Sequence, residues 1–204
     1  NLLTEDNLPS YHRVIADNFT LDDAWGWWVG RWTAEENRHS IVMRDYLVVT
    51  REVDPVANED VRVEHVMKGY RANTYSQLET LAFMAMWERS HAVFCRNLAA
   101  QIDEPVLRDL VGKIAGDEER HAEFFTNVVA FCLSSMREET VEAIAARAAA
   151  LDLVGADIDA YADKVQTVAE AGIFDKAALR GAIADSIAAW GLTDEPRLAE
   201  FTSS

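Results

Sequence analysis

Two short segments of the chain repeat one pattern of chemistry-bearing residues. Residues 35–39 read E-E-N-R-H and residues 117–121 read D-E-E-R-H, so each has an acid, then Glu, any residue, Arg and His. Glu and His three residues apart lie on one face of a helix, where both can ligate one metal ion. The alternative is a set of salt bridges on a solvated helix face. The repeat therefore predicts either a metal site shared by two helices or two charged surfaces.

The residues around both copies favour the metal site. In residues 25–46, apolar side chains recur at steps of three and four, and Glu36 and His39 occupy the middle of that stripe. Glu118 and His121 interrupt the stripe of residues 107–132 in the same way. A buried carboxylate without a partner is costly or takes up a proton. We therefore expect cations beside these side chains.

Two further helices each offer one carboxylate. Glu88 lies on the stripe of residues 78–99, with Glu79 as its rival beside the stripe, and Glu5 has Asp6 as its rival. One Glu from each of two helices, with Glu-x-x-His from two others, is the ligand set of ferritin-like carboxylate bundles. Four carboxylates balance two divalent ions, and oxygen-rich ligation with one imidazole per ion suits iron or manganese better than zinc. The predicted ligands are Glu5, Glu36, His39, Glu88, Glu118 and His121.

The acids that open the two motifs predict a second layer of contacts. Metal-bound histidines usually donate their other ring N–H to a carboxylate or a carbonyl. We expect Asp117 to orient His39 and Glu35 to orient His121, each across to the other helix. The arginine of each motif would balance these acids, or is a plain solvated charge.

The overall composition predicts an all-α protein. Glycine and proline are scarce among the 204 residues, at nine and four, and no alternating strand pattern occurs. We expect one domain over residues 1–204, a ferritin-like four-helix bundle with additional C-terminal helices. Its core bundle would cover about residues 1–134, its helical extension about 136–190, and its tail 191–204. The helices are expected at about residues 2–17, 21–53, 60–69, 75–101, 105–134, 138–150, 158–171 and 176–190.

Three residues are expected to mark helix boundaries or breaks. Thr20 should cap the second helix, and Pro105 suits the first position of its helix. Pro9 lacks the N–H that would bond the carbonyl of Glu5, so it should interrupt the first helix. That kink either loosens the turn that carries a ligand or only serves packing.

Charge and cysteine usage limit the classes of function. Thirty-five acids against nineteen bases give a net charge of −16, which argues against nucleic acid as a partner. The sequence contains no run of 18 or more apolar residues, so it predicts no transmembrane segment. Cys95 and Cys132 lie in apolar helical stretches and should be buried thiols, as in a reducing cytoplasm.

Four motifs together resemble a known family. T-E-D-N-L-P-S-Y near the start, W-T-A-E-E-N-R-H, W-E-R followed by N-L-A, and D-E-E-R-H occur in order. They resemble the soluble acyl-acyl carrier protein desaturases, from residue 1 to about residue 190. The resemblance implies the same six ligands, two iron ions, a homodimer, dioxygen, and electrons from reduced ferredoxin. It implies insertion of a cis double bond into a fatty acyl chain held on acyl carrier protein.

Three features bear on this resemblance. Three residues after Glu88, where the plant enzymes carry a Thr near the oxygen-binding side of the metals, this chain has His91, so oxygen activation would differ. Trp32 resembles a family tryptophan and would serve in electron delivery, or is a core residue. Acyl carrier protein is acidic, so its binding needs a local basic patch. Candidates for that patch are Arg44, Arg51, Lys68 and Arg71.

Two other functional interpretations of the same motifs stay open at this point. One is another di-iron carboxylate oxidase, such as a ribonucleotide reductase small subunit. That enzyme needs a tyrosine close to the irons, and Tyr46 lies two turns beyond His39. The other is a ferritin-like metal-binding homologue without desaturase activity. Storage cages usually form a shorter single bundle without a C-terminal helical extension.

Overall fold

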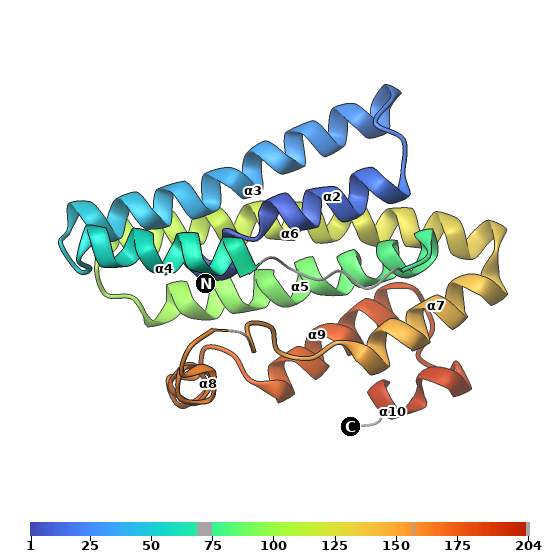
Figure 1. Ribbon diagram of the computed structural model, residues 1–204. Helices are drawn as coiled ribbons and strands as arrows, with labels where there is room; N and C mark the ends of the chain where they lie inside the picture. The colour runs from blue at the N-terminus through green and yellow to red at the C-terminus, as the bar shows by residue number, and fades with distance from the viewer. Residues whose placement is uncertain (69–74, 157, 203–204) are drawn as a thin grey trace. The chain divides into compact units, whose positions relative to one another are not determined.

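The computed structural model describes residues 1–68, 75–156 and 158–202, and every regular element within those ranges is a helix (Figure 1). The prediction of an all-α fold is therefore confirmed. The chain forms two compact units, residues 1–74 and 75–204, so the single domain predicted over residues 1–204 stays a prediction. The helices of the first unit are α1 Leu2–Glu5, α2 Leu8–Asn18, α3 Asp23–Val49 and α4 Pro55–Lys68. Those of the second are α5 Gln77–Gln101, α6 Pro105–Ser135, α7 Arg137–Ala150, α8 Tyr161–Glu170, α9 Lys176–Ala189, the 3₁₀ helix η1 Pro196–Leu198 and α10 Ala199–Thr202.

The first helix is interrupted as expected, just before Pro9. Helix α1 ends at Glu5, and α2 begins at Leu8 with Pro9 in its first turn. A proline is tolerated there because the first N–H groups of a helix have no intrahelical partner. The break therefore separates the turn that carries Glu5 from the longer helix behind it.

The predicted cap of α3 is wrong. The N-cap residue is Asp22, and the Thr20 hydroxyl instead donates to the Asp22 carboxylate at 2.5 Å. The backbone N–H of Asp22 donates back to the Thr20 hydroxyl at 3.1 Å, so Thr20 stabilises a turn that precedes the helix. The chain at Leu21 passes so close to Gly26 that a Cβ there would lie 1.7 Å from the Leu21 carbonyl oxygen. This close approach requires a glycine at position 26.

Helix α4 is longer than the predicted segment of residues 60–69, of which residue 69 lies outside the described residues. It is attached to the start of the chain by Arg62, whose guanidinium donates to both carboxylate oxygens of Asp6 at 2.7 Å. These bonds raise the pKa of Arg62 above its usual value. The contact fixes the residue directly after Glu5 and so supports the turn that carries this predicted ligand.

In the second unit, α5 and α6 run side by side and are joined by a short turn at residues 102–104 (Figure 1). Ser76 and Glu79 form a capping box at the start of α5. Glu104 caps α6, and Pro105 occupies its first position as expected. Apolar side chains such as Met86 and Phe125 are fully buried along this pair. Each helix is therefore capped at its N-terminus, and the two are packed along their facing sides.

The cysteines behave as predicted. Cys95 and Cys132 are both buried free thiols. Burial raises the pKa of the Cys132 thiol, since the interior disfavours the thiolate. Among the described residues, no helix combines the length and the hydrophobicity that a membrane span requires.

The C-terminal helices lie close to their predicted positions, but the tail predicted over residues 191–204 is wrong within the described residues. Residues 196–202 form η1 and α10, and the side chains of Leu192 and Leu198 are 1% and 0% exposed. Arg197 ties this segment to α7 through the Glu138 carboxylate at 2.7 Å. Gly191 ends α9 with φ 67°, and the apolar residues after it are too few for a helical period to stand out.

Candidate metal-ligand sets

The first unit brings three predicted ligands together. Glu5 comes from α1, and Glu36 and His39 lie one turn apart on α3. The His39 Nδ1 atom is 3.9 Å from Glu5 Oε2 and 3.9 Å from Glu36 Oε1. All three side chains are buried, and each offers a ligand atom within 4.8 Å of the others. The Glu-x-x-His pair on α3 therefore lies beside a carboxylate that is distant in the sequence.

The second unit contains the same arrangement. Glu88 comes from α5, and Glu118 and His121 lie one turn apart on α6. The His121 Nδ1 atom is 3.8 Å from Glu88 Oε2 and 3.7 Å from Glu118 Oε2. Glu88, Glu118 and His121 are 1%, 0% and 3% exposed. Both units therefore contain two glutamates and one histidine at almost equal separations.

These separations fit a divalent ion. Ligand bonds of about 2.0–2.2 Å place two ligand atoms roughly 3.0 Å apart at a right angle and roughly 4.2 Å apart across the ion. The four observed separations of 3.7–3.9 Å fall in that interval and are longer than a hydrogen bond. A donor set of carboxylates with an imidazole is the kind that suits iron or manganese. Each unit therefore fits one ion.

The rival carboxylates have other partners. Asp6 forms the two bonds to Arg62 described above. Glu79 accepts from the Ser76 backbone N–H at 2.9 Å and contacts Arg147 at 3.3 Å. These contacts favour Glu5 and Glu88 as the ligands. The sequence did not indicate the two arginines, since each is more than fifty residues from the acid that it contacts.

The acids that open the two motifs contact arginines within their own units. Asp117 forms an ion pair with Arg120, as expected for the arginine of that motif. Glu35 accepts from Arg31 Nε at 3.2 Å. The predicted contacts of Asp117 with His39 and of Glu35 with His121 would join the two units, and they stay predictions.

Two further candidates are themselves buried and pack against aromatic side chains. His91, on α5, is 7% exposed, and its Nδ1 atom lies 3.1 Å from Glu118 Oε1. Trp32, on α3, is 1% exposed and stacks on Trp28 with ring centroids 6.1 Å apart and an interplanar angle of 10°. This packing agrees with a core role for Trp32, and its predicted part in electron delivery stays a prediction.

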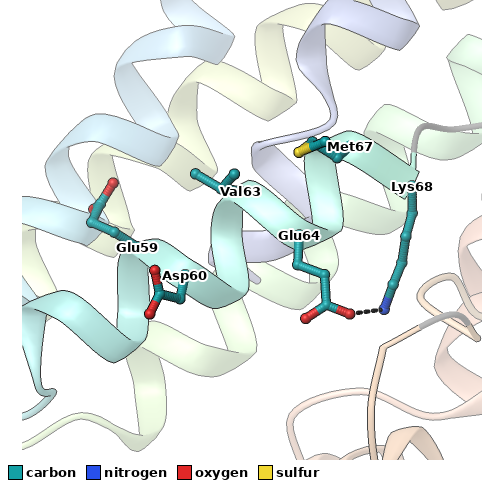
Figure 2. A pocket seen from close by; sticks show the side chains of 6 residues that line it. All are labelled: Glu59, Asp60, Val63, Glu64, Met67 and Lys68. Carbon is teal, nitrogen blue, oxygen red and sulfur yellow. Dashed lines mark ion pairs between the residues drawn. The ribbon is translucent and has the colours of Figure 1, made fainter.

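Two residues of the predicted basic patch form ion pairs with acids. Arg44 contacts Glu59 at 2.5 Å, which lowers the pKa of that carboxyl, and Lys68 contacts Glu64 at 3.0 Å. Arg71 lies outside the described residues. Figure 2 shows the Lys68–Glu64 pair at the edge of a shallow hollow on α4, which contains none of the predicted ligands. The hollow is lined by Glu59, Asp60, Val63, Glu64, Met67 and Lys68.

A helical protein in which two units each bury a Glu-x-x-His pair beside a third carboxylate belongs to the class of ferritin-like carboxylate proteins. Within that class, the sequence model of the fatty acid desaturase family matches residues 1–203. The chain therefore belongs to this family. Membership makes it an oxidoreductase, as predicted.

The relatives agree with this assignment. The chain is 62% identical to Mycobacterium tuberculosis DesA2, named as an acyl-[acyl-carrier-protein] desaturase, over 99% of this chain and 74% of that protein. It is 31% identical to rice acyl-[acyl-carrier-protein] desaturase 7, over 95% of this chain and 52% of that protein. The X-ray structure of Mycobacterium tuberculosis DesA2 matches with a TM-score of 0.80 and 56% identity, over 100% of this chain and 78% of that one. The predicted ferritin-like fold and family are therefore confirmed.

Proposed function

We propose that the chain binds two iron ions, one at each ligand set, and desaturates a fatty acyl chain carried on acyl carrier protein. The observation that carries this proposal is the pair of buried Glu-Glu-His sets, which recur with separations of 3.7–3.9 Å in a member of the desaturase family. The ligands are Glu5, Glu36, His39, Glu88, Glu118 and His121. Manganese could substitute, because its ligand preferences are similar.

The substrate follows from the relatives. The bacterial and plant relatives are named as desaturases of acyl chains on acyl carrier protein. Removing two hydrogen atoms from adjacent carbons yields two electrons, and reducing dioxygen to two water molecules takes four. An external donor must therefore supply two electrons, and we propose a ferredoxin-type protein for this role. We also propose a homodimer, as the resemblance to the plant enzymes implies.

The ions with dioxygen would supply the oxidising power that no side chain provides. The chain's own residues hold the ligands in place and exclude water. In the second unit, Met86 and Phe125 are 0% exposed on the helices that carry Glu88 and Glu118. A dry apolar surrounding suits a hydrocarbon substrate and strengthens the electrostatic contacts of the carboxylates.

The test is turnover of a defined substrate. The full chain is loaded with Fe²⁺ without oxygen, then given stearoyl-acyl carrier protein, ferredoxin, its reductase and dioxygen. Mass spectrometry of the released fatty acid should show one product lighter by two hydrogen atoms, absent in Glu118→Gln. Glu123→Gln, which changes an exposed carboxylate on the same helix, should retain activity. Consumption of Fe²⁺ and oxygen without an unsaturated product would instead favour a metal-binding homologue without desaturase activity.

A further inference from the structure

We propose that Asn1 is a positioning residue of the first ligand set, which holds one carboxylate oxygen of Glu5 and keeps the other beside His39. The proposal rests on the proposed metal binding and assigns to the site a residue outside the six ligands. The observation behind it is the hydrogen bond that Asn1 Nδ2 donates to Glu5 Oε1 at 3.2 Å.

The two oxygens of the Glu5 carboxylate have different surroundings. Oε1 accepts the hydrogen bond from Asn1, which precedes Glu5 by four residues and is the N-cap of α1, so the two side chains share one face of the turn. Oε2 lies 3.9 Å from His39 Nδ1, a separation that is longer than a hydrogen bond and suits two atoms bound to a common ion. One oxygen is therefore held by the amide, and the other faces the histidine.

The orientation of the Asn1 amide follows from the chemistry of its neighbours. The same Nδ2 atom also donates to Met43 Sδ at 3.3 Å. An ionised carboxylate and a thioether can only accept hydrogen bonds, so both must face the NH₂ group of the amide and not its carbonyl oxygen. Met43 is 8% exposed and lies one turn after His39 on α3. The amide therefore bridges the turn that carries Glu5 and the helix that carries His39.

The backbone around Glu5 is held at the same time. The carbonyl oxygen of Asn1 accepts from the backbone N–H groups of Thr4 at 2.8 Å and of Glu5 at 3.1 Å. On the other side of Glu5, Asp6 accepts the two bonds from Arg62 described above. A group that is already ordered loses less freedom when it binds, so an oriented carboxylate should bind an ion more tightly than a mobile one.

The second unit offers an internal comparison. Four residues before Glu88, at the position that corresponds to Asn1, the chain has Met84, which is 4% exposed. A methionine side chain has no N–H group, so it cannot donate a hydrogen bond to the carboxylate as Asn1 does. The two ligand sets therefore differ at this position. Loss of the Asn1 donor should affect only the ion of the first set.

The experiment removes the donor and asks whether the effect passes through Glu5. Asn1→Leu replaces the amide with an apolar side chain of similar size, and it is made both in wild type and in Glu5→Ala. Asn18→Leu, which removes an amide that donates to the Val14 carbonyl oxygen at 2.9 Å, is the matched control. Calorimetry measures Co²⁺ binding to each full-length protein, and the visible absorption of bound Co²⁺ reports its coordination. Thermal unfolding of the metal-free proteins controls for folding, which should change little because Asn1 is exposed.

We expect Asn1→Leu to weaken the binding of one of two Co²⁺ equivalents by about 10-fold and to alter its absorption, as for other partners of metal ligands. In Glu5→Ala, the same substitution should change the remaining Co²⁺ affinity by less than about twofold, because the carboxylate through which it acts is gone. Asn18→Leu should also stay within about twofold of wild type, since it lies outside both ligand sets.

Two results would overturn the proposal while leaving the proposed function intact. One is an unchanged Co²⁺ affinity in Asn1→Leu. The other is an equal loss of affinity in wild type and in Glu5→Ala, which would mean that Asn1 supports the fold and does not orient Glu5. Failure of wild type itself to bind Co²⁺, Mn²⁺ or Fe²⁺ would instead overturn the proposed function and this inference together.

Discussion

Replacing Glu88 with Gln should stabilise the metal-free protein and reduce its stabilisation by metal. Glu88 and Glu118 offer oxygens within 4.8 Å of one another, and both are at most 1% exposed. At an effective dielectric constant of about 20, two charges 4.8 Å apart repel by about 3.5 kcal/mol. Proton uptake relieves part of this, so we expect a gain of about 1–3 kcal/mol for the isosteric, neutral Gln. At about 2–4 °C per kcal/mol, the metal-free variant should melt about 2–12 °C higher.

The ion should reduce or reverse this difference between the two proteins. A divalent ion at about 100 times its dissociation constant stabilises wild type by about 2.7 kcal/mol. The variant has lost a ligand and should gain much less. Calorimetric melting of both proteins, with and without Co²⁺, measures all four stabilities, and Glu123→Gln is the matched exposed control. A metal-free Glu88→Gln protein that melts below wild type, with equal stabilisation of both by the ion, would refute the buried-charge reasoning.

Three further predictions concern paired or buried side chains outside the ligand sets. Arg62→Ala leaves the buried Asp6 carboxylate without its two bonds and should cost about 3–5 kcal/mol in urea unfolding, whereas Arg13→Ala, which breaks an exposed pair, should cost less than about 1 kcal/mol. The Ser76 backbone N–H lowers the pKa of Glu79, so this carboxylate stabilises the fold above its unfolded pKa of about 4.3 and loses that effect on acidification. Glu79→Gln should therefore flatten the fall of unfolding free energy between about pH 5 and pH 3, and an unchanged slope would contradict this assignment. Leu198→Ala should cost about 2–5 kcal/mol because its side chain is fully buried, and a loss below about 0.5 kcal/mol would show that the C-terminal segment is not packed as described.

The sequence predicted the helices and the two Glu-x-x-His pairs because both depend on short-range spacing. Glu36 and His39 had to share a face once residues 23–49 were helical, and Glu118 and His121 followed in the same way on α6. Apolar residues on the same stripes then indicated that these faces are buried. The third ligand of each set, from α1 or α5, could be proposed only from its place on a stripe and from the family pattern.

Contacts between residues far apart in the chain could not be predicted in this way. Arg62 lies 56 residues from Asp6, and no periodicity links the two. The cap of α3 was also missed, because Thr20 and Asp22 are both good cap residues and only the folded turn decides between them. The C-terminal segment was mistaken for a tail because isolated leucines carry no pattern until the surface that buries them is known. Helix periodicity therefore predicted the two Glu-x-x-His pairs, whereas the residues that support them could be identified only from the structure.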